Sequence, residues 1–187
     1  MAENQEKQKN GMAEMIFDVV SVLATACIAV TLAFLFLFRT VGVNGSSMEQ
    51  TLSTNDRIIL TATYGEPKHG DVVVTCQPSK VPGIPDVLVK RVIATEGQVV
   101  KFDYTNEKLY VNDVEIEEDY AFYDRKYSYR HGVVEFDPVP EGCVFVMGDN
   151  RNNSTDSRDE RVGFIKEEYI LGKALFRILP FGQFKIG

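Results

Sequence analysis

A run of 20 residues without a charged side chain, residues 19–38, constrains this chain most strongly. As an α-helix the run would be about 30 Å long, which matches the hydrocarbon thickness of a bilayer. Its residues are apolar on every side, whereas the helix of a soluble core is apolar along one stripe. A signal peptide has only about 7–15 apolar residues, and no A-x-A cleavage site follows Phe38. The sequence therefore predicts an uncleaved transmembrane anchor.

This anchor divides the chain into three predicted parts: a short cytoplasmic tail (residues 1–15), the anchor (residues 16–38) and a domain outside the cytoplasm (residues 39–187). Positive charges lie on both sides of the apolar run, so the positive-inside bias does not decide the orientation. A short polar N-terminal tail and a long C-terminal domain favour an N-terminus inside the cell.

The overall composition narrows the classes of function. The 187 residues include 20 Lys and Arg against 27 Asp and Glu, a net charge of -7, whereas a nucleic-acid-binding domain normally has a basic face. Two distant His and scattered Cys predict no metal site, and nothing indicates a cofactor. Three cysteines exclude a disulfide scaffold, but leave open whether Cys76 and Cys143 are bridged.

Beyond the anchor, short β-branched runs alternate with turn sequences, a pattern typical of antiparallel strands. The predicted fold class is mostly β: an antiparallel sheet or barrel-like domain, either closed or built of two packed sheets, behind one N-terminal transmembrane helix. We expect no long helix after the anchor, and at most one short turn at residues 166–170. The predicted strands are residues 57–64, 71–76, 87–95, 99–104, 109–116, 133–136 and 143–147.

Two segments between these strands have unusual compositions. Residues 113–119 hold five acids in seven positions, which predicts a solvated strand edge or turn. Residues 120–129 are aromatic and basic, and fit either an ordinary loop packed on the sheet or a flap near membrane or substrate.

A serine and a lysine indicate nucleophilic chemistry. Ser47 lies in a small-residue turn soon after the anchor, and Lys90 interrupts an apolar strand, where alternation sends Lys90 and Arg91 to opposite faces. A lysine in apolar surroundings loses hydration, which favours the neutral amine. A neutral amine can act as general base for a serine hydroxyl, as in the Ser-Lys variants of the Ser-His-Asp arrangement. The alternative is an edge lysine whose ammonium reaches solvent.

A polar segment, residues 148–158, follows the last predicted strand. It fits a surface turn, and it equally fits a buried polar network that orients a catalytic amine. An Asp and an Arg two residues apart, as at Asp156 and Arg158, can lock such a turn by a bidentate bond.

Four segments in this order behind an anchor resemble the bacterial type I signal peptidases, the membrane-bound Ser/Lys proteases that remove secretory signal peptides. The segments are Ser47-Met48-x-x-Thr51-Leu52, Gly70-Asp71-Val72-Val73, Lys90-Arg91-Val92-Ile93-Ala94-x-x-Gly97 and Gly148-Asp149-Asn150-x-x-x-Ser154-x-Asp156-Ser157-Arg158. The fourth is the most specific. The single anchor and the compact domain resemble the shorter, Gram-positive-like members.

The resemblance implies that Ser47 is the nucleophile and that Lys90 is the general base, which later protonates the leaving amine. Ser154 would hydrogen-bond the amine, Asp156 and Arg158 would hold their turn, and the Ser47 N–H would help bind the oxyanion. Small apolar pockets, which suit substrates with small residues at -1 and -3 from the cut, would be lined by Val41, Val43, Met48, Leu52, Val74 and Val89.

Two positions depart from the family's pattern. The family usually has Pro where this chain has Gln50, and some members carry a Ser hydroxyl, a second oxyanion donor, where it has Gly45. Here such a donor would come from backbone, water or a neighbour such as Ser46. The implied partners are secretory preproteins and membrane lipid. The implied location is the plasma membrane, with the active site close to the membrane surface.

Rival interpretations belong to other classes. A Ser-His hydrolase would need His69 or His131, but both lie in polar turns and the sequence has no Gly-x-Ser-x-Gly elbow. The remaining alternatives are a membrane-tethered β-domain that binds proteins and an inactive homologue. Cleavage of a substrate separates both from an enzyme.

Overall fold

The computed structural model of the chain describes residues 2–78, 82–124, 126, 130–180 and 186, with side chains from residue 14 onward. Helix α1 (Ala2–Leu37) and Phe38 form one unit, and Arg39–Gly187 form another. Within α1, Glu14–Leu37 has a mean hydropathy of 2.5 and is long and apolar enough to cross a membrane. The helix begins at Ala2, so the segment that we expected to be a short tail continues the helix.

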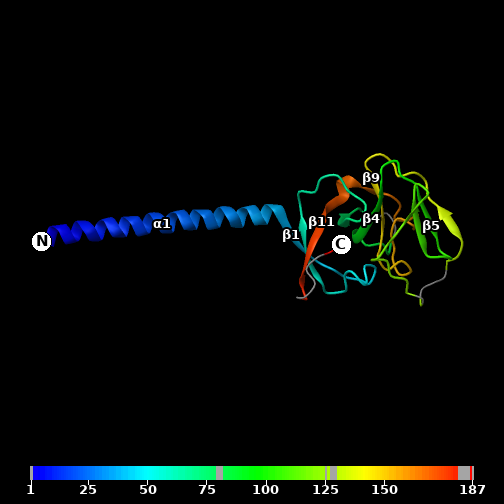
Figure 1. The fold of residues 1–187 in the computed structure, drawn as a ribbon, viewed down its shortest axis with the longest axis horizontal. Coiled ribbons are helices and arrows are strands. Elements are labelled where there is room, and N and C mark those ends of the chain that lie inside the picture. Colours follow the sequence, from blue (N-terminus) through cyan, green and yellow to red (C-terminus); the bar gives the residue numbers. More distant parts are fainter. Residues whose placement is uncertain (1, 79–81, 125, 127–129, 181–185, 187) are drawn as a thin grey trace. The chain divides into compact units, whose positions relative to one another are not determined.

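The second unit contains two antiparallel sheets (Figure 1). The larger sheet has seven strands in the order β1-β2-β11-β3-β4-β9-β10, and the smaller has four in the order β7-β6-β5-β8. The larger sheet is built from β1 (Phe38–Gly42), β2 (Arg57–Thr61), β3 (Val72–Cys76), β4 (Val87–Thr95), β9 (Cys143–Met147), β10 (Ile165–Lys166) and β11 (Ile170–Leu179). The smaller is built from β5 (Val100–Asp103), β6 (Lys108–Val111), β7 (Val114–Ile116) and β8 (Val133–Glu135). The predicted fold class, mostly antiparallel β behind one N-terminal apolar helix, is confirmed.

Strands β4 and β9 have the predicted bounds, and β2, β3, β5 and β8 lie within their predicted runs. Residues 109–116 differ from the prediction, and β1, β10 and β11 were not predicted. Residues 109–116 form the hairpin β6–β7 rather than one strand, because Asn112 and Asp113 take φ values of 51° and 63°, which reverse the chain. Strand β11 was not expected, since its sequence does not alternate. It pairs with β2 on one side and β3 on the other, so tertiary pairing maintains it. The short turn expected near residue 166 is the 3-10 helix η2 (Glu167–Tyr169).

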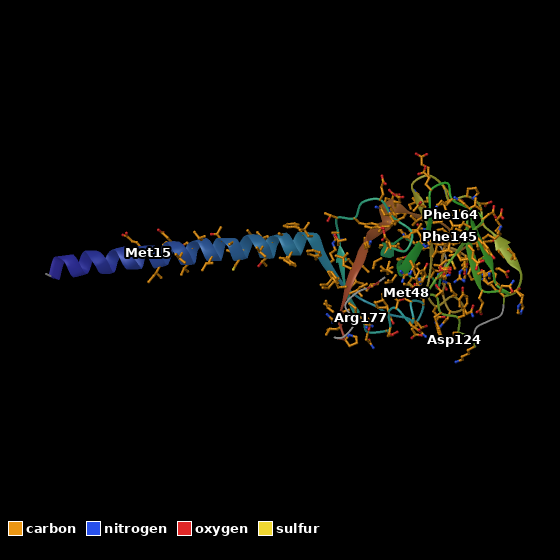
Figure 2. The ribbon with its side chains drawn as sticks, viewed as in Figure 1. Met15, Met48, Asp124, Phe145, Phe164 and Arg177 are labelled. Atoms are coloured by element: carbon orange, nitrogen blue, oxygen red, sulfur yellow. The ribbon has the colours of Figure 1, made fainter. Side chains whose placement is uncertain are left out.

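The core sits on both faces of the central strands. Met48 belongs to a cluster with residues of β2 and β3, and Phe145 of β9 belongs to a second cluster with residues of the smaller sheet. Both side chains lie inside the unit (Figure 2). The valines of β3 and β9 and Val92 of β4 are almost completely buried, as are Ile93 and Ala94 of β4. Strand β4 is therefore fixed by burial and by pairing on both edges, which makes it a rigid support for side chains that it carries.

Candidate active site

Lys90 and Ser47 meet in the structure. Lys90 lies on β4 opposite Val73 of β3, and Ser47 lies in the turn that follows β1. The distance between Lys90 Nζ and Ser47 Oγ is 2.6 Å. A charged amine donates this hydrogen bond, whereas a neutral amine accepts it from the serine hydroxyl. The fold thus joins a strand lysine and a turn serine that are far apart in the sequence.

The environment of Lys90 favours its neutral form. Its side chain is 2% exposed, and burial lowers the pKa of Lys90 from 10.5 to about 8. The charges of Asp156 and Asp149 raise this pKa and that of Arg158 lowers it, each by less than burial does. Within the described part of the chain, no carboxylate forms an ion pair with Lys90. A substantial fraction of the amine is therefore neutral near pH 8 and can accept a proton.

A cleft of about 630 Å³ opens at Ser47 and Lys90. Four of the residues expected to form substrate pockets line it, namely Val41, Val43, Met48 and Val89. The other two, Leu52 and Val74, are completely buried in the core cluster that also holds Val43 and Met48. Leu52 and Val74 therefore support the wall of the cleft from behind.

Ser154 lines the same cleft. Its hydroxyl oxygen is buried and has no hydrogen-bond partner among the described residues, although it lies near enough to Asp156 to help lower the pKa of that carboxyl. The hydrogen bond expected between Ser154 and Lys90 is not formed in this structure. A role of Ser154 in orienting the amine stays a prediction.

Asp156 and Arg158 pair as their spacing suggests. Arg158 donates to the Asp156 carboxylate twice, at 2.9 and 2.8 Å, and the Gly148 N–H donates to the same carboxylate at 2.9 Å. Burial alone would raise the pKa of Asp156, but Arg158 and these hydrogen bonds lower it to about 2. The pair stabilises the turn between Gly148 and Arg158 from within.

Gly148 allows this turn to approach the nucleophile closely. A Cβ at Gly148 would lie 2.4 Å from the carbonyl oxygen of Ser47 and 2.3 Å from Ser154 Oγ. Both separations are far below van der Waals contact, so only glycine permits this backbone contact.

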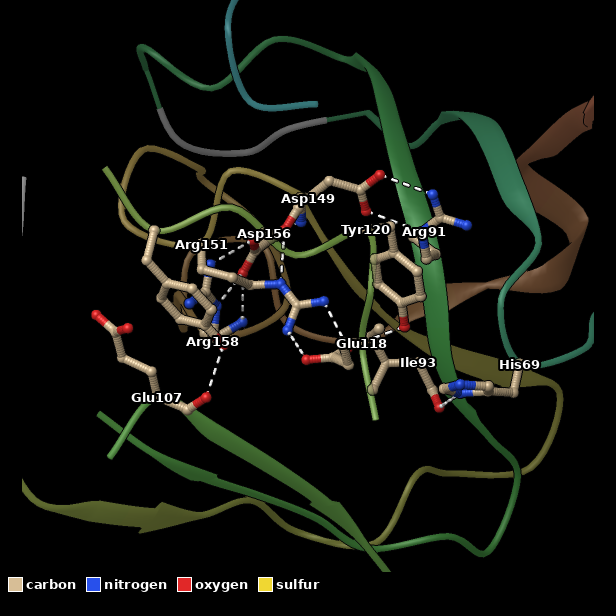
Figure 3. Close-up of polar contacts among 12 residues, drawn as sticks. His69, Arg91, Ile93, Glu107, Glu118, Tyr120, Asp149, Arg151, Asp156 and Arg158 are labelled. Atoms are coloured by element: carbon tan, nitrogen blue, oxygen red, sulfur yellow. Dashed lines mark hydrogen bonds and ion pairs between the residues drawn. The ribbon is translucent and has the colours of Figure 1, made fainter. Parts of the chain in front are cut away.

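Arg91, next to Lys90 on β4, forms a set of buried contacts that the sequence did not indicate. It donates to Asp149 at 2.8 and 2.7 Å, and its guanidinium lies 3.9 Å from the ring centroid of Tyr120 (Figure 3). Asp149 also accepts a hydrogen bond from the hydroxyl of Thr51 at 2.5 Å. One buried carboxylate therefore links the strand that carries Lys90 to the turn that carries Ser47.

Glu118 corrects the expectation of a solvated acidic run. Its side chain is 5% exposed and pairs with Arg151, which is fully buried; Arg151 Nη2 lies 2.6 Å from Glu118 Oε1 (Figure 3). Asp113 and Glu115 are exposed, as expected. Tyr120 donates to Glu118 at 2.9 Å, so this part of the aromatic segment packs against the ion pairs. Residues 125 and 127–129 of that segment lie outside the described residues.

The described residues contain no group of three or more His, Cys, Asp or Glu placed to hold a metal ion. Cys76 and Cys143 are free thiols. The chemistry that the cleft supports directly is that of a hydroxyl and a low-pKa amine.

Comparisons with known proteins identify the family of this chain. Residues 16–179 match the model of the family described as signal peptidase, peptidase S26. The chain is 38% identical over 170 residues to signal peptidase I T of Bacillus subtilis, with 84% of each chain covered. It is 32% identical over 190 residues to signal peptidase IB of Staphylococcus aureus, covering 93% of this chain and 95% of that one.

A crystal structure of a signal peptidase I from Enterococcus faecalis matches 59% of this chain and 98% of its own, at 27% identity. Its TM-score of 0.45 is too low to establish a shared fold. The family model, however, spans most of the chain, and both relatives exceed 30% identity over more than two thirds of it. The chain therefore belongs to the signal peptidase family, peptidase S26.

Proposed function

We propose that this chain acts as a signal peptidase I in which Ser47 is the nucleophile and Lys90 the general base. It cleaves signal peptides from secreted preproteins after small residues at -1 and -3. Membership of the S26 family makes it a protease that processes signal peptides. The observation that carries the assignment of roles is the 2.6 Å contact between Ser47 Oγ and the Nζ of a buried lysine.

The proton movements follow from this contact. Neutral Lys90 takes the hydroxyl proton of Ser47 as Oγ attacks the scissile carbonyl, and a tetrahedral oxyanion forms. The Lys90 ammonium then gives its proton to the departing amine, which leaves an acyl group on Ser47. Lys90, neutral again, takes a proton from the water that attacks this ester, and returns it to Ser47 Oγ.

The apolar lining of the cleft supports the proposed substrate class. Alternate residues of an extended peptide point to the same side, so the residues at -1 and -3 face one wall. The branched side chains of Val41, Val43 and Val89 and the side chain of Met48 give the cleft an apolar wall, which suits small apolar side chains at these two positions.

The apolar helix and the family together identify a membrane-anchored protein. The proposed topology has a cytoplasmic N-terminus and the unit Arg39–Gly187 on the outer side of the plasma membrane, where signal peptides emerge. The apolar segment of a substrate would lie in the same bilayer as the anchor, which raises the effective concentration of the substrate.

The test is cleavage by the detergent-solubilised full chain of a preprotein that carries an Ala-x-Ala site. Ser47→Ala and Lys90→Met are each expected to lower the rate by about 1,000-fold or more. Matched controls are Ser53→Ala, at an exposed serine, and Lys101→Met, at a β5 lysine paired with Asp113. Cleavage that survives either active-site substitution would overturn the assignment. A binding module or an inactive homologue would leave the preprotein uncut.

A further inference from the structure

Asn150 donates hydrogen bonds to two consecutive backbone carbonyls in the turn that carries Ser47. Its backbone N–H donates to the carbonyl oxygen of Ser47 at 3.0 Å, and its side-chain Nδ2 donates to the carbonyl oxygen of Ser46 at 3.2 Å. Asn150 is 1% exposed, so water does not compete for these bonds.

The second bond acts on the peptide group that joins Ser46 to Ser47. In a planar trans peptide the C=O and the N–H point in opposite directions. Within the described part of the chain the Ser47 N–H donates to no acceptor, and both serines line the cleft. The hydrogen bond from Asn150 to the Ser46 carbonyl therefore also fixes the direction of this free N–H. It polarises the peptide as well, since an amide whose oxygen accepts a hydrogen bond is a better donor.

The other end of the Asn150 amide supports a role as donor. Asn150 Oδ1 is buried and has no partner among the described residues, an arrangement that is unfavourable because the oxygen has lost its hydration. Exchanging the two ends of the amide would place Oδ1 against the Ser46 carbonyl oxygen, and the two acceptors would repel each other. The side chain thus keeps the hydrogen bond donated by Nδ2 although Oδ1 is left without a partner.

The backbone around Asn150 cannot move easily away from Ser46. The side chain of Asp149 is paired with Arg91. The backbone carbonyl of Asp149 accepts a hydrogen bond from the Phe122 N–H at 2.7 Å, and the Phe122 carbonyl accepts one from the Arg151 N–H at 2.8 Å. The Ser46 carbonyl also accepts the Glu49 N–H at 3.2 Å, a bond within the turn that does not depend on Asn150. Removal of the Asn150 side chain should therefore leave the turn folded and free only its orientation.

We propose that Asn150 is a positioning residue for oxyanion stabilisation: its side-chain amide holds the Ser46–Ser47 peptide so that the Ser47 N–H meets the developing negative charge. The inference rests on the proposed function, because it requires a tetrahedral intermediate on Ser47. Gly45 supplies no side-chain donor, so the orientation of the Ser47 N–H has more influence on the rate in this chain.

The test combines Asn150→Ala with kinetics of the full chain on the Ala-x-Ala preprotein. The kcat is expected to fall by about 10- to 100-fold, because a preorganised donor is misdirected rather than removed. The KM and the pH midpoint of cleavage should stay unchanged, because the cleft walls and Lys90 are untouched. Asn106→Ala, at an exposed turn asparagine, is the control.

A peptide aldehyde that ends in an Ala-x-Ala sequence provides a readout that a merely structural role would not give. The aldehyde adds to Ser47 and forms an oxyanion, whereas the corresponding alcohol binds without one. Asn150→Ala should weaken inhibition by the aldehyde by the same factor as kcat and leave binding of the alcohol unchanged. Equal weakening of both, a raised KM, or a shifted pH midpoint would overturn the proposal.

A second variant covers a failure of Asn150→Ala to fold. Asn150→Asp keeps the shape of the side chain but places an acceptor against the Ser46 carbonyl, so its kcat should fall at least as far. A folded Asn150 variant with a kcat within about twofold of the unaltered chain would overturn the inference. Cleavage that still depends on Ser47 would then leave the proposed function standing, whereas cleavage by Ser47→Ala would refute that function instead.

Discussion

Lys90 and Arg91 are neighbours on β4 and equally buried, yet the fold treats their charges in opposite ways. Arg91 donates twice to Asp149 and stacks on Tyr120, whereas the Lys90 amine, among the residues that the structure describes, is hydrogen-bonded only to the Ser47 hydroxyl. Burial of a charge without a partner is costly, so an amine in that position shifts toward its neutral form. Strand β4 therefore has a structural face, which carries Arg91, and a catalytic face, which carries Lys90.

The other buried arginines follow the pattern of Arg91. Arg151 pairs with Glu118, and Arg158 pairs with Asp156. Guanidinium groups stay charged at any accessible pH and match carboxylates in bidentate geometry, so they suit permanent links between loops. Lysine loses its proton more readily, which suits the position that must titrate.

The largest expected effect comes from giving Lys90 the permanent charge of its neighbour. Lys90→Arg should lower kcat/KM by about 1,000-fold or more, because a guanidinium cannot accept the Ser47 proton. Preprotein cleavage measured between pH 7 and 10 checks this expectation. Recovery of the rate at alkaline pH would show that a group other than Lys90 is the base.

The next largest effect is expected from removing Asp149, the partner of Arg91 on the structural face of β4. Asp149→Ala should lower the free energy of unfolding by about 3–5 kcal/mol, since it leaves Arg91 buried and unpaired. Thermal or urea unfolding of the purified chain measures this change. Asp159→Ala, which breaks the more exposed pair with Arg161, is the matched control and should change stability by less than about 1 kcal/mol. Equal effects at both sites would contradict the conclusion that Arg91 depends on a buried carboxylate partner.

Lys90→Met should stabilise the folded chain at pH 7. A lowering of the Lys90 pKa from 10.5 to about 8 corresponds to about 3 kcal/mol of destabilisation when both folded and unfolded states are protonated. Between pH 8 and 10.5 the unfolded state binds more protons, so the stability of the unaltered chain rises with pH and the difference shrinks. Unfolding measured at pH 7 and pH 10 tests this. A difference that does not depend on pH would place the titration elsewhere.

The smallest expected effect concerns the pH profile. The charge of Asp156 raises the pKa of Lys90 and that of Arg158 lowers it, so Asp156→Asn should move the midpoint of kcat/KM to lower pH. Cleavage measured from pH 6 to 10 gives the midpoint. A shift to higher pH would show that these charges do not act on the base as the structure indicates.

Local patterns in the sequence account for much of this architecture. The uncharged run predicts an apolar helix without any tertiary information, because a segment apolar on every side needs an apolar environment all round. The β-branched runs predict strands such as β4 and β9, and an apolar strand that carries Lys90 draws attention to that residue. The spacing of Asp156 and Arg158 predicts their ion pair, since residues two apart in a turn can meet.

Contacts between distant segments were decided only by the tertiary structure. Strand β11 exists because β2 and β3 pair with it on both edges. Glu118 belongs to an acidic run that resembles a solvated edge, and only its approach to Arg151 makes it a buried partner. Leu52 and Val74 lie behind the cleft rather than along it.

The sequence by itself therefore determined the apolar helix, the β class and the identity of the serine and lysine that the resemblance singles out, because these depend on composition and on neighbours along the chain. The tertiary structure decided that Lys90 is buried beside Ser47 with no carboxylate partner in the described ranges, while Asp149 binds both Arg91 and Thr51. Hydration, hydrogen bonding and pKa depend on what surrounds a side chain in space, and distant segments supply those surroundings only when the chain is folded.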